Sequence, residues 1–412
     1  MGFQKAIVYL VIFAIILVII VLVFQNSEAP LRFPEKQKGV KLFQPKQSIP
    51  GMVSTLLSKH GETLVVTGVQ MDAAGTPMAL VYAANGGILQ TSLSPSKQTP
   101  GNPGISEQMP PGMTGSLSGD GKTLVLGIPS DNGGVGGVWV FKQQSGAGKW
   151  VEVTTALVGA GAEGAAGQGA AVSLSGDGGT LAVGGPLDNT TKAAVWIFVG
   201  SNLSQAQGSK LAGCGIAVSL SHDGNVLAAT TPDFAVQIWR RSVDGKNNWT
   251  QRANVVGLGI LPQDFFGDTI GLSGNGKMLV VSAPGRGTGT VMSFRTSDSD
   301  GSSNWKQVGG SLKVSGVLGT KPNIGSSVSM SEDGRVLAVG GSGDNGGVGA
   351  TWVFTRERDE DHWSQRKKLV GSGEVGVGAQ GSSLGLSGNG KKLAVTGPLD
   401  NNKVGATWLF GH

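Results

Sequence analysis

Ionisable and sulfur-containing side chains are scarce in this 412-residue chain, of which charged residues make up only 14%. It has one cysteine, Cys214, and four histidines, His60, His222, His362 and His412. A single cysteine excludes an intrachain disulfide framework and a cysteine-based zinc finger. Four scattered histidines leave little for a histidine-rich metal site, so we expect neither a metal nor a cofactor.

Glycine, by contrast, is abundant, with 70 residues, and hydrophobic residues make up 39% of the chain. The glycines follow no strict three-residue period, which excludes collagen. The hydrophobic content excludes wholesale disorder, because such a chain can bury enough apolar surface to offset the entropy of ordering. The composition therefore favours many short strands joined by tight turns.

The net charge of +5 is concentrated at the N-terminus. The first 50 residues hold six basic and two acidic side chains, whereas residues 51–412 hold 26 basic and 25 acidic ones. The remainder of the chain is thus nearly neutral, and we predict no nucleic-acid partner.

An uninterrupted apolar run of 19 residues extends from Ala6 to Phe24. As a helix it would be roughly 28 Å long, close to the ~30 Å hydrocarbon core of a bilayer. The alternative, a cleaved signal peptide, has a shorter apolar region of ~7–15 residues. Its only nearby cleavage site, Ser27–Ala29, precedes Pro30. We predict that residues 1–25 form a single-pass membrane anchor.

The side of the membrane is predicted from charge and from sequons. Five of the six N-terminal basic residues follow the apolar run, which favours a cytosolic location for the rest of the chain. The lack of disulfides agrees with that side. Glycosylation sequons at Asn189, Asn202 and Asn248 favour the extracellular side, which stays as the alternative.

A short phrase recurs seven times and predicts the fold. It consists of Leu-Ser or Met-Ser, one residue, Asp-Gly or Asn-Gly, and then an apolar strand. Its serines, the first in a degenerate copy, are Ser58, Ser118, Ser175, Ser221, Ser273, Ser331 and Ser387. Each copy reads as four antiparallel strands, with Asp-Gly as a hairpin turn. We therefore predict an all-β, seven-bladed β-propeller over residues 51–412.

The seventh copy ends at His412 without its own fourth strand. In other copies a tryptophan precedes the next turn serine by 24 to 26 residues, and the same distance before Ser58 falls on Phe33. We predict that residues 31–43, within a basic tether over residues 26–50, supply the missing outer strand and remove a free sheet edge.

The repeat resembles FG-GAP-type propeller repeats, which also occur in integrin α-chain heads and in bacterial and giant-virus surface proteins. The resemblance rests on the segments 380–384, 393–401 and 404–410 and covers residues 110–412 well. It implies a binding or scaffolding role without catalysis. Calcium-binding members carry several carboxylates in the first turn, whereas each turn here has at most one, such as Asp120 or Asp333. We predict structural hairpins and not metal loops.

No arrangement of residues predicts an active site. His222 lies between Ser221 and Asp223, but adjacent side chains point in different directions, so we interpret it as turn filler. The glycine-rich stretches at 133–136 and 346–349 open no helix that could hold a phosphate. We interpret five mid-strand tryptophans as packing between blades: Trp139, Trp196, Trp239, Trp352 and Trp408.

Alternate loops of a blade emerge on the same face, so the Asp-Asn loops share one face with the links between blades. We predict that this face binds a protein partner through Asp131, Asn132, Asp188, Asn189, Asp344, Asn345, Asp400 and Asn401. The alternative is that these side chains only cap their own turns.

The sequence thus predicts a non-enzymatic, membrane-anchored scaffold with protein partners. A narrower version, implied by the giant-virus resemblance, is a virion component that links an internal membrane to the capsid shell. The alternative is an extracellular adhesion or glycan-binding propeller. An enzyme that uses the central channel is disfavoured, because no cluster of titratable residues converges in the repeat.

Overall fold

The computed structural model describes residues 40–42, 54–69, 77–96, 113–145, 148–244, 246–301, 303–357 and 360–411. The chain divides into two compact units, Met1–Lys36 and Gln37–His412, and every described residue lies in the second. The predicted anchor at 6–24 therefore lies outside the described residues. Among the residues that are described, no helix is long and apolar enough to cross a membrane.

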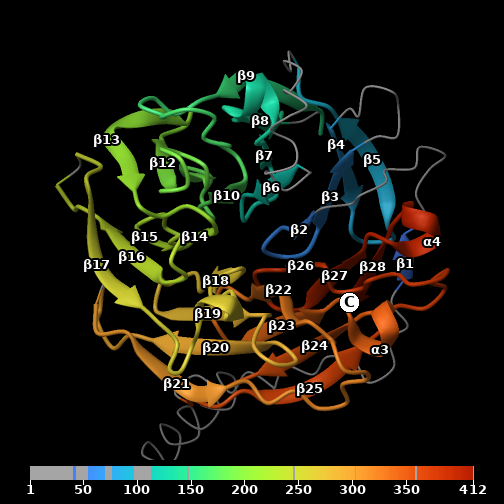
Figure 1. The fold of residues 1–412 in the computed structure, drawn as a ribbon. Helices are drawn as coiled ribbons and strands as arrows, with labels where there is room; N and C mark the ends of the chain where they lie inside the picture. Colours follow the sequence, from blue (N-terminus) through green and yellow to red (C-terminus); the bar gives the residue numbers. More distant parts are fainter. Residues whose placement is uncertain are drawn as a thin grey trace, which may run out of the picture. The chain divides into compact units, whose positions relative to one another are not determined.

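Seven four-stranded antiparallel sheets form a closed ring, which confirms the predicted all-β, seven-bladed propeller (Figure 1). In blades 1 to 4 the strands are β2 (Ser54–Leu57), β3 (Thr63–Val69), β4 (Pro77–Ala83), β5 (Ile88–Leu93); β6 (Thr114–Leu117), β7 (Thr123–Ile128), β8 (Gly137–Gln143), β9 (Trp150–Leu157); β10 (Ala171–Leu174), β11 (Thr180–Gly185), β12 (Ala194–Val199), β13 (Ser204–Ala212); and β14 (Val218–Leu220), β15 (Val226–Thr230), β16 (Val236–Arg241), β17 (Trp249–Val255).

In blades 5 to 7 they are β18 (Ile270–Leu272), β19 (Met278–Ala283), β20 (Thr290–Arg295), β21 (Lys306–Ser311); β22 (Ile324–Met330), β23 (Val336–Gly341), β24 (Ala350–Thr355), β25 (Ser364–Leu369); and β26 (Ser383–Leu386), β27 (Lys392–Gly397), β28 (Ala406–Gly411), with β1 (Val40–Leu42). Short helical turns follow three second strands, at α2 (Asp131–Gly134), α3 (Asp344–Gly347) and α4 (Asp400–Lys403), and η1 (Pro262–Asp264) lies between blades 4 and 5.

Strand β1 closes the ring, as the missing fourth strand of blade 7 predicted. It pairs antiparallel with β28, so that Val40 faces Leu409 and Leu42 faces Thr407. The paired segment covers three residues of the predicted 31–43. Phe33, which marked the strand in the sequence, lies outside the described residues. The two ends of the propeller are thereby joined in one sheet, which has four strands like the other six.

The core lies between blades. The second strands carry apolar side chains on both faces, and β11, β19, β23 and β27 are buried along their whole length. Each apolar cluster joins neighbouring blades: Val125 and Val140 of blade 2, for example, pack with Leu181 and Trp196 of blade 3. Because neither face of such a strand meets water, its residues need not alternate with polar ones.

Four of the five predicted packing tryptophans are fully buried: Trp139, Trp196, Trp352 and Trp408. Trp239 is only half-buried, but it too packs against an apolar cluster that joins two blades, here blades 3 and 4, as predicted. Trp196 on the third strand of blade 3 pairs with Val183 on the second strand. At the equivalent position of blade 4 Gln237 pairs with Ala229, and Trp239 lies two residues further along the third strand.

A lysine clamp recurs in blades 3, 6 and 7. In blade 7, Lys41 on β1 forms an ion pair with buried Asp400 at 2.7 Å and lies 5.6 Å from the ring of Trp408. Its ammonium also donates a hydrogen bond to the Gly373 carbonyl, at 2.7 Å. The same set consists of Asp188, Lys210, Trp196 and Gly161 in blade 3, and of Asp344, Lys368, Trp352 and Gly316 in blade 6.

The Asp-Gly turns lie at one end of the propeller axis, the turn face, and the Asp-Asn loops and the links between blades lie at the other, the link face. This follows from the antiparallel order of every blade. Strand β1 runs from the turn face to the link face, because it is antiparallel to β28.

We predict that Lys41→Met lowers the free energy of unfolding by about 2–3 kcal/mol, because it leaves the buried Asp400 carboxylate without its cation. Methionine keeps the apolar contact with Trp408. Urea denaturation measures the loss, and hydrogen exchange reports whether β28 becomes less protected.

Lys210→Met is the matched control, since it breaks the same clamp in a blade whose four strands are continuous in the chain. We expect a similar loss of stability but no loss of protection in β28. Unchanged stability in Lys41→Met would contradict the assigned role of the clamp.

Candidate functional site

The aspartates of the Asp-Asn pairs are internal supports of the link face. Asp131, Asp188, Asp344 and Asp400 are all buried. In blade 6, Asp344 accepts a hydrogen bond from the Leu318 N–H at 2.7 Å with one oxygen and pairs with Lys368 through the other. Asp400 binds the Val375 N–H and Lys41 in the same way, and Asp188 binds the Glu163 N–H and Lys210.

The asparagines of the pairs have left-handed backbone conformations, with φ between 47° and 51°, a region that asparagine tolerates better than most residues. The backbone N–H of Asn345 donates to the Leu318 carbonyl, and that of Asn401 donates to the Val375 carbonyl. In blades 3, 6 and 7 the pair therefore holds one link residue by both its N–H and its carbonyl. We call this arrangement the Asp-Asn staple.

The stapled residue itself faces solvent. Leu318 is 52% exposed and Val375 is 55% exposed. The equivalent residue of blade 3 is Glu163, whose side chain is 61% exposed. The staples thus present an apolar side chain in blades 6 and 7 and a charged one in blade 3.

These contacts place all eight predicted binding residues on the link face. The four aspartates point inward, whereas Asn132, Asn345 and Asn401 are exposed and Asn189 is half-exposed. Their role in partner binding stays a prediction. Sequence reasoning missed Leu318 and Val375, although apolar residues inside glycine-rich links, as in Val375–Gly378, were a readable signal.

Exposed apolar side chains gather in one part of the link face, the apolar sector, formed by the connections 256–269, 284–289, 312–323, 342–349, 370–382 and 398–405. Of the thirteen large apolar residues exposed among the described ones, nine belong to it: Val256, Leu258, Leu261, Phe265, Leu318, Val370, Val375, Val377 and Leu399. Contiguous exposed apolar surface marks interaction sites more often than scattered residues do.

A groove of about 680 Å³ lies in the apolar sector. Loops of three consecutive blades line it, through Pro284 of blade 5, Gly343 of blade 6 and Leu399 of blade 7. Val377 and Ala379 of the last link complete its apolar wall, and Lys321 is the one ionisable side chain among its described lining residues.

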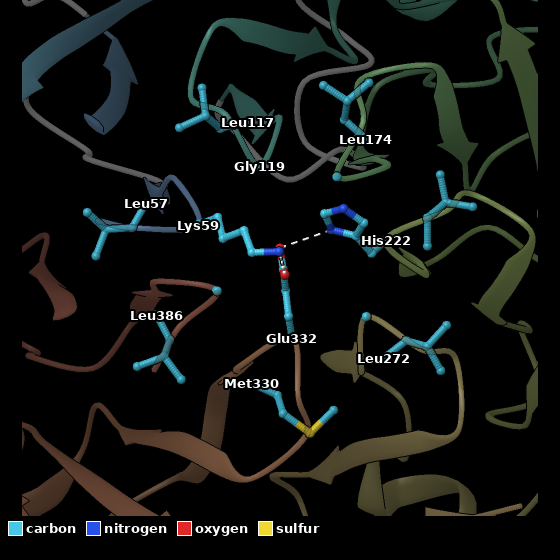
Figure 2. A pocket seen from close by; sticks show the side chains of 14 residues that line it. Leu57, Lys59, Leu117, Gly119, Leu174, His222, Leu272, Met330, Glu332 and Leu386 are labelled. Carbon is cyan, nitrogen blue, oxygen red and sulfur yellow. Dashed lines mark hydrogen bonds and ion pairs between the residues drawn. The ribbon is translucent and has the colours of Figure 1, made fainter. Parts of the chain in front are cut away.

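The opposite, turn end of the axis is bridged by three charged side chains. Glu332 of blade 6 receives Lys59 of blade 1 on one carboxylate oxygen, at 2.7 Å, and Nδ1 of His222 of blade 4 on the other, at 3.0 Å. Figure 2 shows the three side chains meeting over the axis. Beneath them is a cavity of about 170 Å³, with a collar formed by Leu57, Leu117, Leu174, Leu220, Leu272, Met330 and Leu386.

The three bridging residues occupy the same repeat position, directly after the turn serine. His222 has the turn position predicted for it, but its interpretation as filler is wrong, because its imidazole binds Glu332 across the axis. The other four copies carry glycine there. At Gly176 a Cβ would lie 2.0 Å from the His222 ring, and at Gly388 it would lie 2.9 Å from the Glu332 carboxyl.

The Asp-Gly turns are closed by their own side chains. In blade 4 the Ser221 hydroxyl donates to Asp223 at 2.6 Å and accepts the N–H of Val226 at 3.0 Å. Partial burial alone raises the pKa of Asp223, but hydrogen bonds from Ser221 and Asn225 outweigh it and hold the pKa below its ordinary value. The carboxylate thus serves the turn, as predicted. Among the described residues no group of three or more His, Cys, Asp or Glu could hold a metal.

Comparisons with known proteins identify the fold and no family. No family model matches the chain, and no curated protein matches it. The FG-GAP assignment therefore stays a prediction.

Solved structures match over most of the chain at low identity. The β-propeller domain of Cps50 (Swd1) from Myceliophteria thermophila has a TM-score of 0.56 at 12% identity, covering 91% of this chain and 99% of that one. Hydrazine synthase of Kuenenia stuttgartiensis has 0.55 at 14%, covering 90% and 98%. A putative 6-phosphogluconolactonase from Bacteroides uniformis has 0.55 at 14%, covering 82% and 94%. These diverse proteins share the propeller, and sharing it assigns no activity.

We predict that Asp223→Asn lowers stability by less than about 1 kcal/mol at neutral pH, because asparagine cannot offer a charged acceptor to the turn. A depressed native pKa stabilises the fold above the unfolded-state pKa of about 3.9 and loses that contribution as the pH falls. The deficit should therefore shrink towards pH 3 in denaturation experiments.

Asn275 and Asn389 occupy the same position in other turns, so asparagine fits the geometry. Asp223→Ala, which removes the acceptor altogether, should be destabilised at both pH values. A deficit of Asp223→Asn that grows in acid would refute the assignment.

We also predict that Gly176→Ala separates the His222 imidazole from Glu332 while Lys59 stays paired, because the new methyl group occupies the position of the ring. The cost in stability should be below about 1 kcal/mol, since all three side chains are partly exposed. A crystal structure of the variant tests this. Gly119→Ala is the control, because its Cβ would lie 3.5 Å from the His222 ring, and an unchanged His222 contact in Gly176→Ala would contradict the prediction.

Proposed function

We propose that the chain is a non-enzymatic interaction scaffold that is tethered to a membrane by residues 6–24 and binds a protein partner through the apolar sector. The observation that carries the proposal is the gathering of nine exposed apolar side chains in the links and loops of that sector. Leaving such a surface in water is unfavourable, and folded proteins seldom expose one without a use for it.

The charges at the turn end of the axis support a role without catalysis, because Lys59, His222 and Glu332 bind one another. In the narrower version of the proposal, implied by the FG-GAP resemblance, the partner is a capsid shell and the membrane is internal to a virion.

The extracellular adhesion reading is the second candidate, because two of the three sequon asparagines, Asn202 and Asn248, are exposed. Protease treatment of sealed vesicles separates the two, since a cytosolic propeller is digested and a translocated one is protected. Glycosylation of Asn202 and Asn248 in the native protein would favour the second candidate.

Photo-crosslinking of the full chain in its native membrane tests the binding face. We predict that a photoreactive residue at Leu318 or Val375 yields a discrete crosslinked protein, and that one at Asn275 on the turn face does not. Leu399→Asp should abolish the product, because a charge is placed in the apolar contact.

Ile88→Asp is the matched control, since Ile88 is 65% exposed but lies on the outer strand β5, outside the sector. It should leave the crosslink intact. Crosslinks that arise only from the turn face, or only to lipid, would overturn the proposed function.

A further inference from the structure

The groove in the apolar sector joins an apolar wall to a single cation. Pro284, Val377, Ala379 and Leu399 provide the wall, and Lys321, Asn323 and Ser342 also line the groove. Lys321 is exposed, and none of the described residues forms an ion pair with it. The volume of about 680 Å³ lies within the usual range for sites that take several side chains or a small ligand.

Among the exposed charged side chains around the groove, basic ones outnumber acidic ones. The connections of the apolar sector carry four basic side chains that reach the surface, Arg286, Lys313, Lys321 and Lys403. Their exposed acids are Asp268 and Glu374. The other three acids of the sector are buried and already bound: Asp264 by the Leu261 N–H, Asp344 by Lys368, and Asp400 by Lys41.

We propose that this groove binds an acidic segment of a partner protein, in which Asp or Glu residues stand beside Leu, Ile or Phe. The inference rests on the proposed function and specifies its partner. The apolar side chains of the segment fill the wall, and a carboxylate pairs with Lys321. Opposite charge on the partner provides specificity and faster association, and like charge is rejected.

Two other occupants share part of this chemistry. A second copy of the chain would bring the exposed basic side chains of two sectors together, which like-charge repulsion opposes. An anionic membrane surface offers the negative charge, and the vesicle measurement below distinguishes it from a protein segment. The apolar wall beside a single lysine favours a protein segment, because a segment offers both kinds of side chain.

Panning of a random peptide library against the full chain in nanodiscs tests the inference. We expect enrichment of peptides that combine Asp or Glu with Leu, Ile or Phe. The best enriched peptide should bind Lys321→Glu and Val377→Asp at least about tenfold more weakly, and its affinity should fall with salt.

Lys122→Glu is the matched control, because Lys122 is an exposed lysine in a turn of blade 2, at the opposite end of the axis. It should leave the affinity unchanged. Circular dichroism of each variant separates a lost contact from a lost fold.

The possible results distinguish this inference from the proposed function. If Leu318 and Val375 crosslink to a protein but the enriched peptides are neutral or basic, the acidic segment is wrong and the scaffold role stands. If phosphatidylserine vesicles bind the propeller in a Lys321-dependent manner and no peptide does, the occupant is a membrane surface and the inference is overturned.

Discussion

A ring of backbone hydrogen bonds around the axis is the constraint on which the rest of the propeller depends. The residue after each turn serine donates its N–H to the carbonyl of the equivalent residue in the next blade, as from Lys59 to Gly119 and from Gly119 to Gly176, at 2.8–2.9 Å. At the junction of blades 7 and 1 the donor is Asn389, one residue later. Because these seven residues converge on one axis, most must be small. Four glycines leave the room that Lys59, His222 and Glu332 fill, and these three side chains bridge the turn end of the cavity (Figure 2).

The two faces of the propeller differ in how their polar groups are bound and in what they expose. The turn face is occupied by contacts within the propeller: turn side chains such as Ser221 and Asp223 bind the backbone of their own turn, and the axial charges bind one another. The link face also satisfies its polar groups, but through buried aspartates and clamp lysines, so that the links can carry apolar residues outward. The same Asp-Asn staple presents Glu163 in blade 3 and Leu318 and Val375 in blades 6 and 7. The side chain that each staple exposes is thus set by the link residue, while the staple keeps its position.

The fold was predictable because each blade repeats one local rule: an Asp-Gly turn fixes the first hairpin, and a fully apolar second strand must lie between two layers. Closure by the N-terminus followed from the missing fourth strand, although the pairing of Val40 with Leu409 has no marker in the sequence. The axial bridge could not be predicted from local pattern, because Lys59, His222 and Glu332 lie in three different blades and meet only when the ring closes. The Asp-Asn pairs could be found in the sequence, but the burial of their aspartates and the ion pairs with lysines on the fourth strands could not, because those lysines are distant in the chain. The missed residues, Leu318 and Val375, are exposed by contacts that only the three-dimensional structure supplies.

The central claim is that the link face is the interaction surface. Hydrogen exchange of the full chain tests it most directly, when exchange in the native membrane is compared with exchange after detergent has separated the chain from its partners. The account predicts that partners protect the connections 256–269, 312–323 and 370–382, and that the Asp-Gly turns exchange equally in both states. Protection confined to the turn face, or to the outer strands such as β5 and β9, would contradict the assignment of the link face as the interaction surface.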